Sequence, residues 1–71
     1  NNAMGYVSLI HRYGHESAIV QTHPSGFAAR RACVQQFKTN PTVSGYTILN
    51  NQTGRRTVRV KKTGFSKENK R

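Results

Sequence analysis

Residues 27–37 read FAARRACVQQF, and they decide the fold because this stretch carries the clearest helical pattern in the chain. Apolar residues recur in it at intervals of three and four residues, which is the period of one helix face. Arg31, Gln35 and Lys38 fall together on the opposite side. We therefore expect one amphipathic helix, with a core-facing side made of Phe27, Ala29, Cys33, Val34 and Phe37.

Both ends of this helix carry boundary signals. Thr22 and Ser25 are two candidate N-caps, because a side-chain hydroxyl accepts a hydrogen bond from the free N–H groups of the first turn. Pro24 is tolerated there, since its missing donor would have no partner in the first turn. Asn40 and Pro41 end the helix, because proline disfavours helical dihedral angles in the residue before it.

Strand-like segments flank the helix on both sides. β-branched and aromatic residues, which suit a pleated half-buried surface, are frequent before and after it. Connections of hairpin length that contain Gly14 and Gly54 separate the strands of each pair. We expect strands at residues 5–13, 17–22, 46–50 and 55–63. The order strand, strand, helix, strand, strand predicts a small single-domain α+β fold, with one helix packed on an antiparallel sheet.

The expected core is short. Besides the helical residues it contains the strand residues Val7, Leu9, Val20, Leu49, Val58 and Val60. A folded chain of about this length buries only roughly 60% of the surface that its unfolded form exposes, so a stability of a few kcal/mol is expected. An exposed sheet edge covered by a second copy, which would make a homodimer, is therefore one of the alternatives.

The two ends of the chain differ from the middle. Residues 1–3 precede Met4 and are interpreted as the remnant of an expression tag. Residues 4–64 are expected to form the single domain. Residues 65–71 are polar and basic, and are expected to form a disordered tail because they offer too little apolar surface to be ordered.

Composition narrows the class of function. The chain has 12 Lys and Arg against 2 Asp and Glu, which gives a formal net charge of +10. Cys33 is the single cysteine, and the sequence shows neither a secretory nor a membrane-spanning segment, so a cytoplasmic location is predicted. No arranged acid–base pair, nucleophile or metal-ligand spacing is recognised among the histidines, carboxylates and Cys33, so no enzyme activity, metal or cofactor is expected.

The informative motif is a ladder of charges near the carboxyl end. Val58 and Val60 alternate with Arg59 and Lys61, so if the valines face the helix, the cations project from the opposite, open face of the sheet. A second cationic patch is expected on the helix. The predicted nucleic-acid-binding residues are Arg55, Arg56, Arg59, Lys61, Lys62, Lys67, Lys70 and Arg71, with Arg30, Arg31 and Lys38 as the second patch.

This charge distribution predicts a non-catalytic protein, accessory or regulatory, that binds the phosphate backbone of DNA or RNA. Tyr6, Tyr13 and Tyr46 are candidates for stacking unpaired bases on the open sheet face. The alternative is a protein-interaction module, such as an inhibitor or adaptor, that docks an acidic partner surface. A membrane-surface role is not expected, because the helix lacks the long apolar face flanked by lysines that interfacial binding needs.

Overall fold

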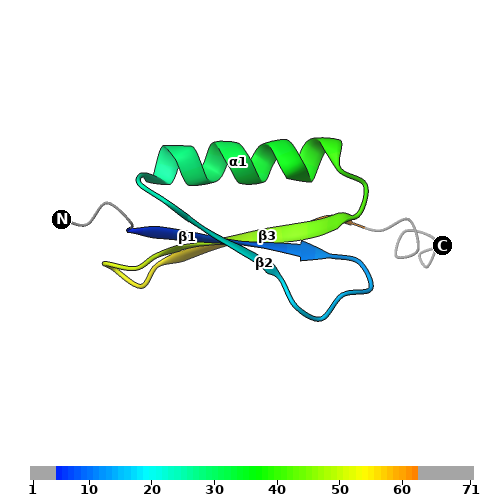
Figure 1. The fold of residues 1–71 in the computed structure, drawn as a ribbon, viewed down its shortest axis with the longest axis horizontal. Coiled ribbons are helices and arrows are strands. Elements are labelled where there is room, and N and C mark those ends of the chain that lie inside the picture. Colours follow the sequence, from blue (N-terminus) through cyan, green and yellow to red (C-terminus); the bar gives the residue numbers. More distant parts are fainter. Residues whose placement is uncertain (1–4, 63–71) are drawn as a thin grey trace.

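The computed structural model of the chain describes residues 5–62 and shows one helix lying across one face of a four-stranded sheet (Figure 1). The predicted order of elements and the small α+β class are confirmed. The expected tag remnant at 1–3 and the expected tail at 65–71 lie outside the described residues. The elements are β1 (Tyr6–Arg12), β2 (Ile19–His23), α1 (Gly26–Thr39), β3 (Val43–Asn50) and β4 (Arg56–Val60).

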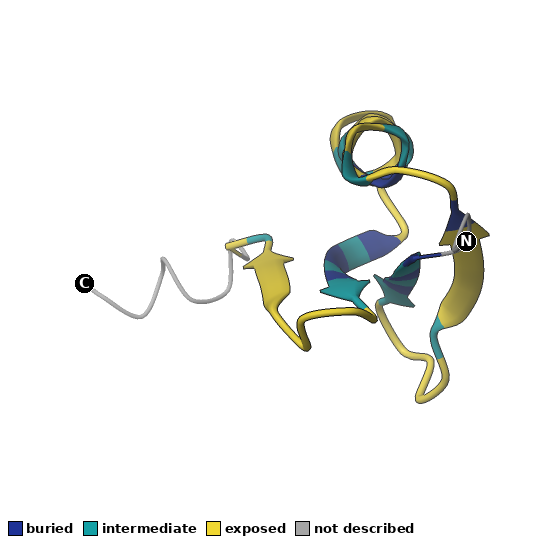
Figure 2. Cartoon of the chain, turned by 90° about the vertical axis from the view of Figure 1, so that its left-hand side faces the viewer, coloured by how far each residue is buried: buried dark blue, intermediate teal, exposed yellow. Residues whose placement is uncertain are grey.

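The strands follow the order β2-β1-β3-β4, and every neighbouring pair is antiparallel. The two hairpins therefore meet at β1 and β3, which are the central strands. The helix packs on β1, β2 and β3, while β4 extends beyond its cover. Figure 2 shows the consequence: both edge strands are exposed except at the end of β2, where His23 is buried, and most other buried residues lie in the helix and the central strands.

The helix begins at the second of the two candidate caps. The Ser25 hydroxyl accepts a hydrogen bond from the Ala28 N–H at 3.1 Å, whereas Thr22 lies within β2. The C-cap is Asn40, whose N–H donates to the Gln36 carbonyl at 2.9 Å, and Pro41 follows it as expected. The helix is thus slightly longer at both ends than the 27–37 pattern indicates.

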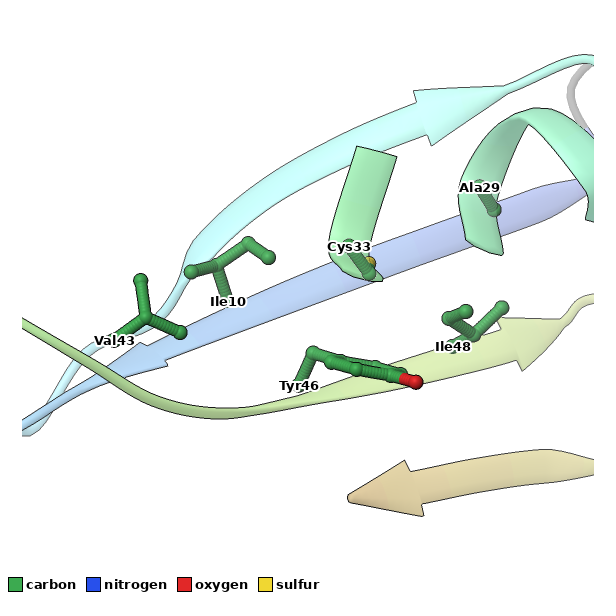
Figure 3. Packing of buried hydrophobic residues seen from close by; sticks show 6 residues of the cluster. All are labelled: Ile10, Ala29, Cys33, Val43, Tyr46 and Ile48. Atoms are coloured by element: carbon green, nitrogen blue, oxygen red, sulfur yellow. The ribbon is translucent and has the colours of Figure 1, made fainter. Parts of the chain in front are cut away.

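The core lies between the helix and the two central strands, where small helical residues face large strand residues. Ala29 and Cys33 allow the helix to approach the sheet closely, and aliphatic and aromatic side chains of β1 and β3 fill the space beneath them. The Phe37 ring packs edge-on against Tyr46, with centroids 5.5 Å apart. The buried apolar residues are Ile10, Ala29, Cys33, Val43, Tyr46 and Ile48 (Figure 3), with Tyr6, Val34 and Phe37 packed against them.

The predicted core is largely confirmed on the helix and wrong on the strands. Ala29 and Cys33 are fully buried, and Val34 and Phe37 flank the core, but Phe27 is 72% exposed. None of the predicted strand residues is fully buried. Val7, Leu9 and Leu49 are half-buried, and Val20, Val58 and Val60 are exposed.

The reason is that alternation along a strand fixes which residues share a face, but not which face the helix covers. β1 is apolar on both faces, with Val7 and Leu9 on one and Ile10 on the other. The helix covers the face that holds Ile10 and Ile48, which lie on neighbouring strands. The face that the sequence pattern favoured is the uncovered one.

Gly45 brings β3 and β4 close together. It pairs with Val60, and a Cβ at this position would collide with the Arg59 carbonyl oxygen and lie 3.1 Å from the Val60 Cα. Only glycine fits such a close backbone approach without a shift of one strand. Gly45 therefore fixes where β4, and with it Arg59, lies relative to the rest of the sheet.

Candidate functional site

Arg59 of β4 and Lys61, which directly follows the strand, lie on the helix side of the sheet. The Arg59 guanidinium carbon is 4.6 Å from the centre of the Phe37 ring, and the Lys61 Nζ is 5.5 Å from it. Val58 and Val60 point the other way and are 58% and 68% exposed. The alternation of charges and valines is as expected, but the prediction that the valines lie under the helix is wrong, and the two faces are exchanged.

Side-chain length explains this exchange. Because β4 extends beyond the helix, a residue on its helix-facing side must span open space to reach α1. A valine is too short to bridge that space. Arg59 and Lys61 lay their long apolar stems toward Phe37 and keep their charged ends in water, as amphipathic side chains do at such borders.

A basic groove lies between the helix and β4, and we call it the α1–β4 groove. Its volume is about 450 Å³. The helix contributes cations and the apolar Val34 to the lining, and Arg59 contributes from β4. The lining residues are Phe27, Arg30, Arg31, Val34, Gln35, Lys38 and Arg59.

The structure thus joins two sets of residues that the sequence placed on separate surfaces. Arg30, Arg31 and Lys38 of the helix, expected as a second patch, share one groove with Arg59 of the charge ladder. Glu16 is the only acidic residue between positions 5 and 62, and it lies in the exposed connection between β1 and β2. The positive charges of the α1–β4 groove therefore have no carboxylate from the described residues beside them.

Other predicted binding residues lie outside the groove. Arg56 pairs with Leu49 on the opposite face of the sheet, and Arg55 lies in the β3–β4 turn. Lys61 donates a hydrogen bond from Nζ to the Asn40 carbonyl at 3.1 Å, which places its charge at the negative end of the helix dipole. Lys62 follows β4 and does not line the groove. Lys67, Lys70 and Arg71 lie outside the described residues.

The sheet face away from the helix is largely apolar apart from Arg56, His11 and the threonines, and we call it the open face. Across the strands Leu9 pairs with Val20 on one side and Thr47 on the other, and Thr47 pairs with Val58. The expected charge ladder is therefore replaced on this face by aliphatic side chains. The apolar residues of the open face are Val7, Leu9, Val20, Leu49, Val58 and Val60.

The tyrosines do not form a stacking surface on the open face. Tyr46 is 4% exposed beneath the helix, so its ring is not available to a base. Tyr6 also lies on the helix side, where its ring would be 3.1 Å from a Cβ at Gly26. Tyr13 is 45% exposed but lies in the turn after β1. Phe27 in the α1–β4 groove is the aromatic residue that the sequence interpretation missed, because the helical period assigned it to the core.

A buried polar pair lies under the helix. The Ser8 Oγ and the His23 Nε2 are hydrogen-bonded at 2.9 Å, which links β1 to β2. Burial raises the pKa of the nearby Cys33 thiol above its ordinary value of 9.0, and a hydrogen bond with Ser8 opposes part of this shift. Ser8 and Cys33 are both 0% exposed, so these two groups are closed to a substrate. Among residues 5–62, no three metal-ligating side chains form a group that could hold an ion.

Comparison of the chain with models of protein families, with curated proteins and with solved structures found no match. Within the described part of the chain, no helix combines the length and the apolarity needed to cross a membrane. In the described part of the chain, the α1–β4 groove combines a concave shape with a cluster of positive charges.

Proposed function

We propose that this protein is a small, non-catalytic nucleic-acid-binding protein that holds a phosphate backbone in the α1–β4 groove. The observation that carries the proposal is the convergence of Arg30, Arg31 and Lys38 of the helix with Arg59 of β4 around one groove. Either DNA or RNA meets this requirement, since both present regularly spaced phosphates. An accessory or regulatory role suits a chain of this size.

Electrostatics favours a polyanion as the occupant. The four groove cations repel one another, and this repulsion weakens the compact state until an anion is bound. Guanidinium groups bind phosphate oxygens through paired N–H donors, and three of the four groove cations are arginines. Each phosphate that is neutralised releases condensed counterions, which adds a favourable entropy to binding.

A purely solvated surface would look different. Surface charges that serve solubility are interspersed in sign. Here the described residues carry one acid, Glu16, and it lies in the connection between β1 and β2, whereas the groove lies at the opposite edge of the sheet, beside β4. The separation of the signs favours a binding surface over a solubility device.

The groove also preorganises one of its cations. The Phe37 ring holds Arg59 at 4.6 Å and is itself fixed by its edge-on contact with Tyr46. A cation over an aromatic ring at such a surface gains about 0.5–1 kcal/mol. Less side-chain freedom is then lost when a phosphate binds Arg59.

The proposal is tested by fluorescence-anisotropy titration of labelled single- and double-stranded DNA and RNA at several salt concentrations. If four phosphates are neutralised, the affinity falls with log salt at a slope of about −3 for single strands and about −4 for duplex DNA. A slope near zero for all four ligands would contradict the proposal.

A matched pair of variants places the binding surface. Arg59→Glu and Arg56→Glu make the same charge change on the same strand, but Arg59 lines the groove and Arg56 lies on the open face. We expect Arg59→Glu to weaken binding at least 10-fold more than Arg56→Glu, a difference of about 1.4 kcal/mol or more. Circular dichroism at the assay temperature shows whether both variants are folded. Equal losses would place the ligand on the whole charged surface and not in the groove.

A second candidate function is a protein-interaction module, an inhibitor or adaptor, that docks an acidic protein surface. The observation that favours it is the open face, where Val58 and Val60 are exposed beside Arg56. Exposed apolar patches mark protein interfaces, and a net charge of +10 selects an acidic partner. Pull-down after nuclease digestion separates the candidates. A partner that survives digestion and is lost in a Val58→Thr, Val60→Thr double variant, but not in Arg59→Glu, supports the interaction module.

A further inference from the structure

We infer that the occupant of the α1–β4 groove is a single-stranded nucleic acid, and that the Phe27 ring stacks against one of its bases. This inference rests on the proposed function and names the class of nucleic acid and the residue that selects it. Phe27 is 72% exposed, a larger fraction than any other large apolar residue of the described chain.

The exposure of Phe27 is costly without a ligand. Leaving such a side chain in water forgoes the hydrophobic stabilisation that its burial would provide. Phe27 lies in the first turn of α1 and lines the groove together with Arg30 and Arg31. The Arg31 guanidinium carbon lies over the ring, 5.9 Å from its centroid, so a cation faces the exposed aromatic ring from one side.

Along the groove side of the helix, an apolar residue is followed four positions later by a cation twice. Phe27, Arg31, Val34 and Lys38 are spaced by four, three and four residues, so they form one line on the helix. At 1.5 Å per residue this line is about 16 Å long, which covers several nucleotides. An aromatic ring at one end followed by cations matches the two needs of a single strand, a stacking platform and a backbone track.

A duplex would not use this ring. In a duplex the bases are stacked on one another, so a protein side chain meets their edges or the backbone, whereas an unpaired base exposes its flat face. Phenylalanine has no hydrogen-bonding group and cannot read a base edge. Its position in a phosphate-binding groove is therefore explained by stacking, and little base preference is expected.

The volume of the groove agrees with a single strand. At about 450 Å³ it falls within the range of pockets that hold small molecules, and so accommodates a segment of one strand. Arg59 of β4 forms the wall opposite the helical line, so the groove is bounded on two sides by the described chain.

The test replaces Phe27 with tryptophan and with alanine. The chain has no tryptophan, so Phe27→Trp introduces a single reporter whose fluorescence is quenched when a base stacks on it. The ligands are a 12-nucleotide oligo-dT, a duplex of the same length, and inorganic polyphosphate, which supplies phosphates without bases. We expect quenching by oligo-dT and none by polyphosphate or by the duplex.

The alanine variant measures the contribution of the ring to affinity. We expect Phe27→Ala to weaken oligo-dT binding roughly 5- to 100-fold and to leave duplex binding unchanged, as removal of one base–aromatic stack does. Tyr13→Ala is the matched control, since Tyr13 is an exposed aromatic residue outside the groove. Tyr13→Ala should change neither the affinity for oligo-dT nor the affinity for the duplex.

The outcomes separate this inference from the proposed function. Salt-dependent binding of nucleic acid with equal affinity for both forms, and no effect of Phe27→Ala, would overturn the stacking inference and leave the proposed function standing. Quenching by polyphosphate alone would also overturn it, because the signal would then report charge and not stacking. Absence of binding to any nucleic acid would overturn both.

Discussion

The Arg59 guanidinium carbon lies 4.6 Å from the centre of the Phe37 ring, and this contact joins the edge strand β4 to the helix. The backbones of α1 and β4 do not pack against each other, so side chains make the connection. Lys61 adds a second one through its hydrogen bond to the Asn40 carbonyl. The shape of the α1–β4 groove therefore depends on Phe37, although Phe37 is not among the residues that line it.

Phe37→Leu tests this dependence. Leucine keeps apolar bulk at the edge of the core but removes the ring beneath Arg59 and the edge-on contact with Tyr46. We expect the free energy of unfolding, measured by urea denaturation, to fall by about 1–2 kcal/mol. Nucleic-acid affinity should fall as well, because Arg59 loses its fixed position.

Phe27→Leu is the control for the stability measurement, since Phe27 is exposed and does not belong to the core cluster beneath the helix. It should leave the free energy of unfolding within about 0.5 kcal/mol of the parent chain. Equal stability of the Phe37→Leu and Phe27→Leu variants would show that the ring under Arg59 contributes nothing to the fold.

Gly45→Ala is expected to displace β4. The new Cβ would collide with the Arg59 carbonyl oxygen, which is backbone and cannot move without the strand. We expect a loss of about 1–3 kcal/mol in the free energy of unfolding, as in other overpacked sites. The Lys61 amide, which donates to the Ser44 carbonyl at 2.9 Å, should lose its protection from hydrogen exchange.

Gly54→Ala offers a comparison with a different physical cause. Gly54 has φ +78° and open space around a Cβ, so alanine there meets backbone strain but no collision. The cost should be about 1–2 kcal/mol, with the Lys61 amide still protected. Loss of that protection in both variants would mean that β4 responds to any destabilisation of the hairpin.

Because the Cys33 thiol is buried, we expect the free energy of unfolding to depend on pH in alkaline solution. Because burial raises the pKa of Cys33 in the folded protein above 9.0, the unfolded chain releases the thiol proton at a lower pH than the folded chain does. The stability from this group is complete below pH 9 and is lost as the pH rises through the folded-state value. Cys33→Ala should be less stable at pH 7 and should lose less stability between pH 8.5 and 10 than the parent chain. If the free energies of unfolding of Cys33→Ala and of the parent chain changed in parallel with pH, a raised thiol pKa would be contradicted.

The sequence predicted the order of elements because each local signal agreed with the fold. The helical period of 27–37, the proline after Asn40 and the glycine at position 54 act over a few residues and need no knowledge of the sheet. Gly54 does adopt the positive φ that its turn requires.

Local signals could not predict which face of the sheet the helix covers. Alternation correctly placed Arg59 and Lys61 together and apart from Val58 and Val60, but β4 by itself contains nothing that says which face meets the helix. That choice depends on β3 lying beside β1, which leaves β4 beyond the helix where only long side chains reach α1. Phe27 was misassigned for a related reason, since helical spacing describes a side of a helix and not the width of the sheet beneath it.

Val58→Thr and Val43→Thr test the exchange of faces directly. Threonine has nearly the shape of valine and suits a strand, so the difference between the two variants reports burial of the new hydroxyl. Val43 is 1% exposed and Val58 is 58% exposed. We expect Val43→Thr to lower the free energy of unfolding by about 1–3 kcal/mol, and Val58→Thr to change it by less than about 0.5 kcal/mol. A large loss for Val58→Thr in urea denaturation would mean that the valines of β4 lie under the helix after all, and that Arg59 then points away from the groove.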